Sequence, residues 1–212
     1  MVTEQHSNRT QTLLLVGLTA VFIGYLTVWL PGPNVGLQFL GFEMGEWTKF
    51  LGMNTRRNLF YLPPIILSAI LLFLTLCWSP QRWQIWVWRF LAVTSSFLIF
   101  PALEDLRGAT QVEYISRVLG VGMIFVLAVG VTLIGWFFWE RSWLKMVSWL
   151  LILLVALVGA ILPTQVYLEV QTAVNPLFGS TVGIGIGVWL NGVGCLLITA
   201  IGLTQLINLT KK

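Results

Sequence analysis

Six apolar stretches dominate this chain, and each approaches the roughly 20 residues that a helix needs to cross a bilayer. They cover about 12–30, 60–78, 86–103, 115–138, 144–162 and 181–207. Only 9% of the residues are charged, whereas soluble domains carry about 25%. A chain this apolar needs lipid as its solvent. The sequence therefore predicts an all-α, polytopic membrane helix bundle that forms a single domain over residues 1–212.

The third stretch is the weakest, because only the fourteen residues from Phe90 to Leu103 are free of charge. A stretch of that length also suits a re-entrant segment. Charge favours six spans with both termini in the cytoplasm, with inner segments 1–11, 79–89, 139–146 and 208–212. These short segments carry seven Lys and Arg residues, against five in the longer outer segments. Under this topology Arg89 snorkels to the inner interface.

Two further features support an uncleaved protein of the cell membrane with this orientation. The first apolar run is longer than a signal-peptide core and lacks an A-x-A cleavage site. Eight of the eleven tryptophans flank the predicted inner loops, namely Trp78, Trp83, Trp86, Trp88, Trp136, Trp139, Trp143 and Trp149. Such rings form an aromatic belt at the membrane interface. The alternative is a platform that binds lipid or pigment.

The last apolar stretch is rich in glycine, although glycine weakens a helix by about 1 kcal/mol relative to alanine. On a helical wheel one narrow arc holds Ser180, Gly183, Gly187, Asn191, Gly194, Ile198 and Gln205. Small residues at this spacing let two helix backbones approach closely in lipid, and Asn191 and Gln205 can hydrogen-bond across the contact. Gly17 and Gly24 form a lesser face in the first stretch. We predict a helix-packing face that meets a helix of the same bundle or a neighbouring subunit.

The predicted outer segments contain one further helix and several charges. Residues 36–52 show helical periodicity with apolar groups on every side, which predicts an interfacial helix covered by the bundle and by a partner, or an ordinary interfacial helix with exposed Phe. The outer charges predict a polar pocket made by Glu104, Asp105, Arg107, Glu113, Arg117 and Glu169. The alternative is a set of solvated loop charges near lipid head groups.

Several functional classes are disfavoured by what the sequence contains. His6 is the one histidine and lies in the polar N-terminal segment, so histidine-ligated haem or metal and a Ser-His-Asp triad are not expected. Cys77 and Cys195 lie inside apolar runs without metal-type spacing. No Asp, Glu, Lys or Arg occupies the middle of a predicted span, which argues against a pump. We predict no catalytic residue, metal or cofactor, and the net charge of +4 does not indicate a nucleic-acid partner.

Three functions remain after these exclusions. The first is a non-catalytic accessory, scaffold or assembly subunit that contacts the lipid bilayer and other membrane subunits, or a second copy of itself, through its small-residue faces. The second is a small-solute or lipid transporter with a path near Asn191. The third is a membrane enzyme that acts on lipid head groups, with Glu104, Asp105 and Glu113 as acid–base groups and Arg56 and Arg57 on the phosphate. The first agrees best with the sequence.

Overall fold

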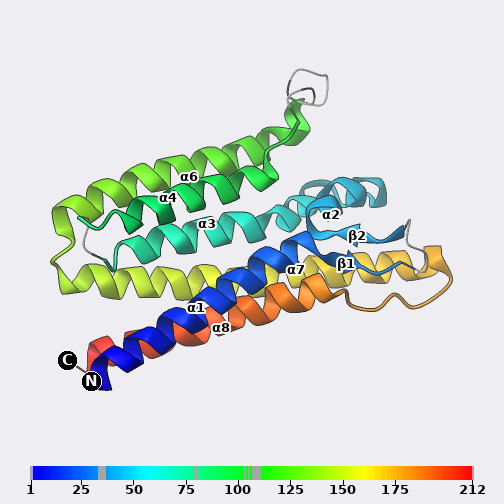
Figure 1. Cartoon of the computed structure of the whole chain (residues 1–212). Helices are drawn as coiled ribbons and strands as arrows, with labels where there is room; N and C mark the ends of the chain where they lie inside the picture. The colour runs from blue at the N-terminus through cyan, green and yellow to red at the C-terminus, as the bar shows by residue number, and fades with distance from the viewer. Residues whose placement is uncertain are drawn as a thin grey trace.

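The chain folds into a bundle of long helices with a small two-stranded ribbon at one end (Figure 1). The computed structural model describes residues 2–32, 37–78, 81–102, 104, 106 and 111–211, and the side chains of 2–8 and 111–113 are not part of that description. Its elements are α1 (Val2–Leu26), β1 (Val28–Leu30), β2 (Phe39–Leu40), α2 (Gly41–Trp47), the 3₁₀ helices η2 (Thr48–Leu51) and η3 (Asn54–Tyr61), α3 (Leu62–Thr75), α4 (Gln84–Ser96), the 3₁₀ turn η4 (Phe97–Ile99), α6 (Gln111–Phe138), α7 (Ser142–Phe178) and α8 (Ile186–Thr210).

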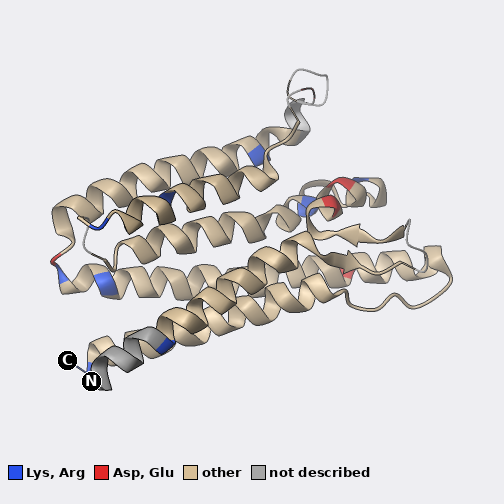
Figure 2. Ribbon diagram, in the orientation of Figure 1, with Lys and Arg blue, Asp and Glu red and all other residues tan. Residues whose placement is uncertain are grey.

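Five helices of the described chain are long and apolar enough to cross a membrane. They are Arg9–Leu26, Asn54–Thr75, Tyr114–Phe138, Ser142–Phe178 and Ile186–Thr210. The weakest predicted span, 86–103, forms a shorter apolar helix over Gln84–Ile99. Charged residues gather toward the two ends of the bundle and leave the middle of the long helices largely apolar (Figure 2). The all-α expectation is therefore confirmed for the described residues, with five helices of spanning length rather than six.

Both ends of the described chain lie at the same end of the bundle (Figure 1). The connection from α3 to α4 and the connection from α6 to α7 lie there too, and the ribbon and α2 lie at the opposite end. In the interior, α1 packs along α8, α8 packs along α7, and α3 contacts α4, α6 and α7. The main apolar core, which includes Ile70, Leu72, Ile152 and Ile198, fills the space between these helices.

The first helix ends earlier than the predicted boundary at residue 30. α1 stops at Leu26, and Val28–Leu30 forms β1, which pairs antiparallel with β2 and places Val28 opposite Leu40. Leu30 precedes Pro31, and a residue before proline disfavours the helical conformation. Because β2 occupies residues 39–40, the helix predicted over 36–52 begins only at Gly41 and continues through η2 to Leu51.

The two last helices also correct the predicted boundaries. α7 was expected to end near residue 162, but it continues through Pro163 and Pro176 to Phe178, where Gly179 in the left-handed conformation (φ 63°) ends it. The following segment is extended, and the Gly185 N–H donates to the Trp29 carbonyl at 3.0 Å. α8 therefore begins at Ile186 rather than at residue 181.

Arg89 does not snorkel to the surface as expected. Its side chain is buried in α4, and Nε donates to Thr75 Oγ1 of α3 at 3.3 Å. The guanidinium lies over the Trp86 ring at 5.2 Å from the ring centroid. This arrangement buries one charge between α3 and α4.

Candidate functional site

The small residues of α1 and α8 face each other along the bundle. A Cβ placed on Gly194 would lie 2.7 Å from the carbonyl oxygen of Gly17, and one placed on Gly24 would lie 2.8 Å from the backbone nitrogen of Asn191. Side chains at these positions would collide with backbone, which cannot move aside as a flexible side chain can. The structure therefore brings Gly17, Gly24, Gly187 and Gly194 into one contact within the chain.

Asn191 lies beside this contact and reaches the next helix. Its side chain is fully buried, and Nδ2 donates to the Gly159 carbonyl of α7 at 3.1 Å. In a regular α-helix that carbonyl accepts from the N–H four residues later. Here residue 163 is proline, which has no N–H. Asn191 supplies the missing donor from a neighbouring helix, which is how proline is tolerated inside membrane helices.

Two other residues of the predicted glycine face, Gly183 and Gln205, have different roles. Gly183 precedes α8, and a Cβ placed on it would meet no atom within 4 Å. Its carbonyl accepts a hydrogen bond from the Tyr167 hydroxyl at 2.7 Å, so it holds the extended segment to α7. Gln205 lies near the other end of α8, where Nε2 donates to Thr10 Oγ1 of α1 at 3.4 Å. Gly183 is therefore not part of the helix face, because the helix starts three residues after it.

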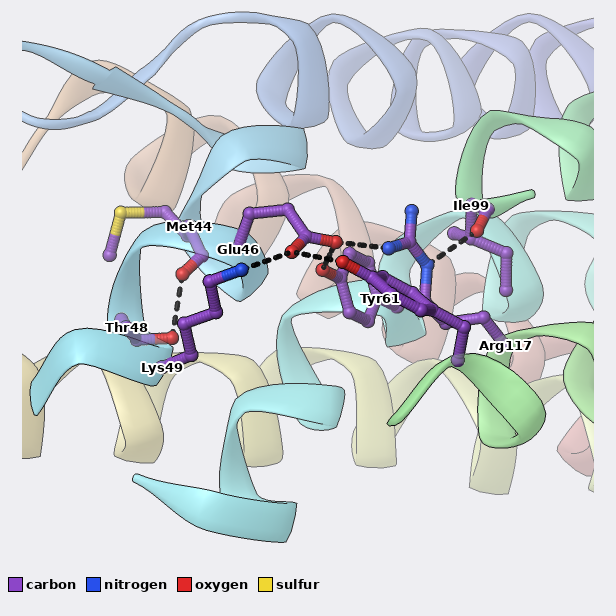
Figure 3. A network of polar contacts seen from close by, with 8 residues as sticks. Met44, Glu46, Thr48, Lys49, Tyr61, Ile99 and Arg117 are labelled. Atoms are coloured by element: carbon purple, nitrogen blue, oxygen red, sulfur yellow. Dashed lines mark hydrogen bonds and ion pairs between the residues drawn. The ribbon is translucent and has the colours of Figure 1, made fainter. Parts of the chain in front are cut away.

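A polar cluster joins α2, η3 and α6 at the ribbon end of the bundle (Figure 3). Arg117 pairs with Glu46, and its Nε donates to the Ile99 carbonyl at 2.8 Å. The guanidinium lies over the Tyr61 ring at 4.3 Å from the centroid. Glu46 also accepts from Tyr61 at 3.1 Å and from Tyr114 at 3.3 Å. Among the described residues, one carboxylate thus holds together groups from three separate elements.

Two residues of the predicted outer pocket, Arg117 and Glu169, each pair with a residue outside it. Glu169 pairs with Arg56 at 2.5 Å, with both side chains largely exposed, whereas Arg117 pairs with Glu46. Glu104 is exposed. Asp105, Arg107 and the side chain of Glu113 lie outside the described residues. The sequence prediction missed the partners Glu46 and Tyr61. Glu46 occupies a polar position of the helix predicted over 36–52, and this position was the signal in the sequence that could have indicated it.

One buried tyrosine lies close to this cluster without a hydrogen bond. Tyr25 is 1% exposed, and its hydroxyl has no partner among the described residues. It belongs to a small apolar cluster with Tyr61, Ile99 and Val121. Gly45 makes this packing possible, because a Cβ there would overlap the Tyr61 ring.

The polar contacts described above connect one helix to another. The described residues contain no group of three or more His, Cys, Asp or Glu that could hold a metal ion. Both cysteines are unpaired, with Cys195 buried and Cys77 half-buried. No protein-family model, curated protein or solved structure matches this chain.

Proposed function

We propose that the chain is a six-span membrane protein, with both termini in the cytoplasm, that acts as a non-catalytic accessory, scaffold or assembly subunit of a larger membrane complex. The apolar helices and the charges at the two ends of the bundle support membrane insertion. The short helix Gln84–Ile99 serves as the remaining span, since an even number of crossings agrees with termini at one end. Arg9, Arg82, Arg141, Lys145 and Lys211 favour the cytoplasmic side for that end.

The observation that carries the accessory role is the outer face of α6. Val126 is 74% exposed and Val129 is 60% exposed, and a Cβ placed on neighbouring Gly122 would meet no atom within 4 Å. A glycine inside a helix costs about 1 kcal/mol relative to alanine. At Gly24 and Gly194 close packing inside the chain offsets that cost, but at Gly122 and Gly130, eight positions apart on α6, no described residue lies within 4 Å of an added Cβ, whereas α8 has a single such glycine, Gly192. We propose that a transmembrane helix of another subunit packs against this face.

An experiment on the same face of α6 tests the accessory role. The tagged chain is extracted from its native membranes in mild detergent and weighed by native mass spectrometry. We expect a partner in fixed ratio, which Gly122→Leu removes. Gly192→Leu is the matched control, since a Cβ on Gly192 of α8 also meets nothing within 4 Å. A monodisperse monomer overturns the accessory role, and equal behaviour of the two variants overturns the assignment to α6.

The transporter is the second candidate and rests on Asn191, the polar side chain at depth in the predicted bundle. The bond from Asn191 to Gly159 supports a structural role instead, because it satisfies a carbonyl that Pro163 leaves open. The enzyme acting on head groups has less support still. Glu104 is exposed, and Arg56, which would contact the phosphate, pairs with Glu169.

A further inference from the structure

A lateral cleft opens between α1, α3 and α4, on the side of the bundle away from α8. Its volume is about 290 Å³, close to the lower end of the roughly 300–1,000 Å³ of small-molecule sites. Its lining residues come from α1, the end of α3 and the start of α4, and the connection from α3 to α4 lies at the end of the bundle that carries both termini (Figure 1). It lies between helices that the proposed topology places in the bilayer, so the surroundings that fill it are lipid.

The wall of this cleft is apolar and includes an aromatic pair. Leu14 and Leu18 of α1 face Leu74 of α3 across it. Trp78 and Trp88 close it on the α4 side, with ring centroids 6.1 Å apart. Such a surface accepts a hydrocarbon chain, and tryptophan favours the level of the membrane at which head groups begin.

The rim of the cleft is polar and basic. Gln11, Arg82 and Gln84 line it, and none of the described lining residues is acidic. Arg82 is exposed and makes no ion pair with any residue that the structure describes. Arg117 and Arg56, by contrast, are each paired with a carboxylate. Among the described residues, the lining therefore offers a cation without an acidic partner and two amides beside an apolar groove, which complements an anionic head group attached to a chain.

We propose that this cleft binds one anionic phospholipid of the cytoplasmic leaflet. Arg82 contacts the phosphate, Gln11 and Gln84 donate hydrogen bonds to the head group, and one acyl chain follows the groove between α1 and α3 past the Trp78–Trp88 pair. Basic sites between membrane helices on this side are typical of phospholipid recognition. The inference rests on the membrane insertion proposed above, but not on the accessory role.

Native mass spectrometry of the purified full chain tests the site. The protein in detergent is titrated with phosphatidylglycerol or with phosphatidylcholine of the same acyl chains. We expect one phosphatidylglycerol to be retained in preference to phosphatidylcholine. Arg82→Gln should weaken this retention roughly fivefold, the effect of about 1 kcal/mol for one basic residue near the head groups. Arg141→Gln is the control, since Arg141 is exposed at the same end and does not line the cleft.

A second pair of variants tests the groove without changing charge. Leu15 and Leu13 are similarly exposed on α1, at 45% and 48%, and of these two only Leu15 lines the cleft. We expect Leu15→Trp to obstruct the acyl chain and reduce retention, whereas Leu13→Trp leaves it unchanged. Equal retention in both pairs of variants, or equal retention of the two lipids, would mean a general lipid annulus and overturn the site.

Two further arms separate the remaining outcomes. Glycerol phosphate should not displace the lipid, because it lacks the chain, and displacement by it would overturn the phospholipid assignment in favour of a free phosphate-ester site. Carbonate washing of membranes tests insertion separately. Release of the chain by carbonate overturns the proposed membrane protein, whereas a retained chain that shows no preference for phosphatidylglycerol overturns the cleft alone.

Discussion

Gly24 and Gly187 face each other across the contact between α1 and α8. A Cβ on Gly24 would lie 2.9 Å from the Gly187 carbonyl oxygen, and a Cβ on Gly187 would lie 2.6 Å from the Gly24 carbonyl oxygen. The Gly24 carbonyl also accepts a hydrogen bond from Trp29 Nε1 at 2.8 Å, so it is fixed in place from a second direction. The pair allows the backbones of α1 and α8 to approach closely at this point.

Gly24→Ala should destabilise the fold, because its Cβ meets backbone atoms of α8 on a helix that is held by several such contacts. Overpacking of this kind costs about 1–3 kcal/mol. Gly122→Ala is the matched control. A Cβ there meets nothing within 4 Å, and the gain in helix propensity of up to about 1 kcal/mol makes it neutral or stabilising. Thermal unfolding in detergent measures the stability of both variants. A Gly24→Ala midpoint at or above that of the wild type would contradict the proposed role of the contact between α1 and α8.

The spacing of small residues could be read from the sequence, but the point where the last helix begins could not. Gly187, Asn191 and Gly194 share a face at helical spacing, and the structure places them against other helices. Gly183 continues the same spacing one turn earlier, yet it lies in an extended segment. That segment is fixed by the Tyr167 hydroxyl and by Asn175, whose side chain accepts from the Val182 N–H at 2.7 Å. Contacts with α7 decide where α8 begins, and the spacing of small residues in the sequence carries no information on those contacts.

Asn191→Leu should destabilise the chain because it removes the donor that reaches the Gly159 carbonyl. Leaving a buried acceptor without a partner costs about 1–3 kcal/mol. If this bond compensates for Pro163, the loss should shrink when Pro163→Ala restores an N–H four residues after Gly159. We expect a coupling of at least about 0.5 kcal/mol in the double-mutant cycle, measured by unfolding in detergent. Strictly additive effects of the two substitutions would contradict the compensation.

The same double variant separates structure from transport. Its fold is expected to be more stable than that of Asn191→Leu alone. A protein with a transport path at Asn191 would then be folded yet inactive in a vesicle flux assay. Solute flux that returns together with stability would instead show that the amide acts on the fold.

The course of α7 shows why proline misleads when a sequence is read alone. The predicted span over 144–162 ends directly before Pro163, and a proline removes an N–H and crowds the preceding turn. The helix continues because the Gly159 carbonyl, which Pro163 leaves without a donor, accepts a hydrogen bond from Asn191. Asn191 lies 28 positions after Pro163 in the chain. The sequence identified Asn191 as the polar group at depth, but only the packing of α7 against α8 reveals the carbonyl that it serves.

Glu46→Gln should lower stability more than Glu169→Gln, although the chemical change is identical. Glu46 faces the Arg117 side chain, which is only 11% exposed, and also accepts from two tyrosines. Removing its charge leaves a largely desolvated guanidinium with a weaker partner, at a cost of about 1.5–3 kcal/mol. Glu169 pairs with Arg56, and their side chains are 40% and 64% exposed, respectively. Exposed pairs contribute about 0–1 kcal/mol. Equal shifts of the unfolding midpoint for the two variants would contradict this difference.

The outer charges illustrate a different limit of sequence reasoning. The sequence places Arg117 in one outer pocket with Glu113 and Glu169, because all three lie on the same predicted side of the membrane. Its observed carboxylate partner is Glu46, 71 positions earlier in the chain. Glu46 reaches Arg117 because β1 and β2 pair and direct α2 toward α6. The helix predicted over 36–52 includes residues 39–40, which form the short strand β2.

The topology itself predicts a labelling pattern. Cys77 and Cys195 are first replaced by serine, and single cysteines are introduced at Arg9, Lys49 or Lys211, all exposed in the structure. With both termini at one end of the bundle and α2 at the other, a membrane-impermeant maleimide should label Lys49→Cys in intact cells. It should reach Arg9→Cys and Lys211→Cys only after permeabilisation, since the end that carries the basic residues faces the cytoplasm. Labelling of Arg9→Cys and Lys211→Cys from opposite sides would mean an odd number of crossings. The helix Gln84–Ile99 would then not span the membrane, and the basic residues Arg141 and Lys145 would change sides with it.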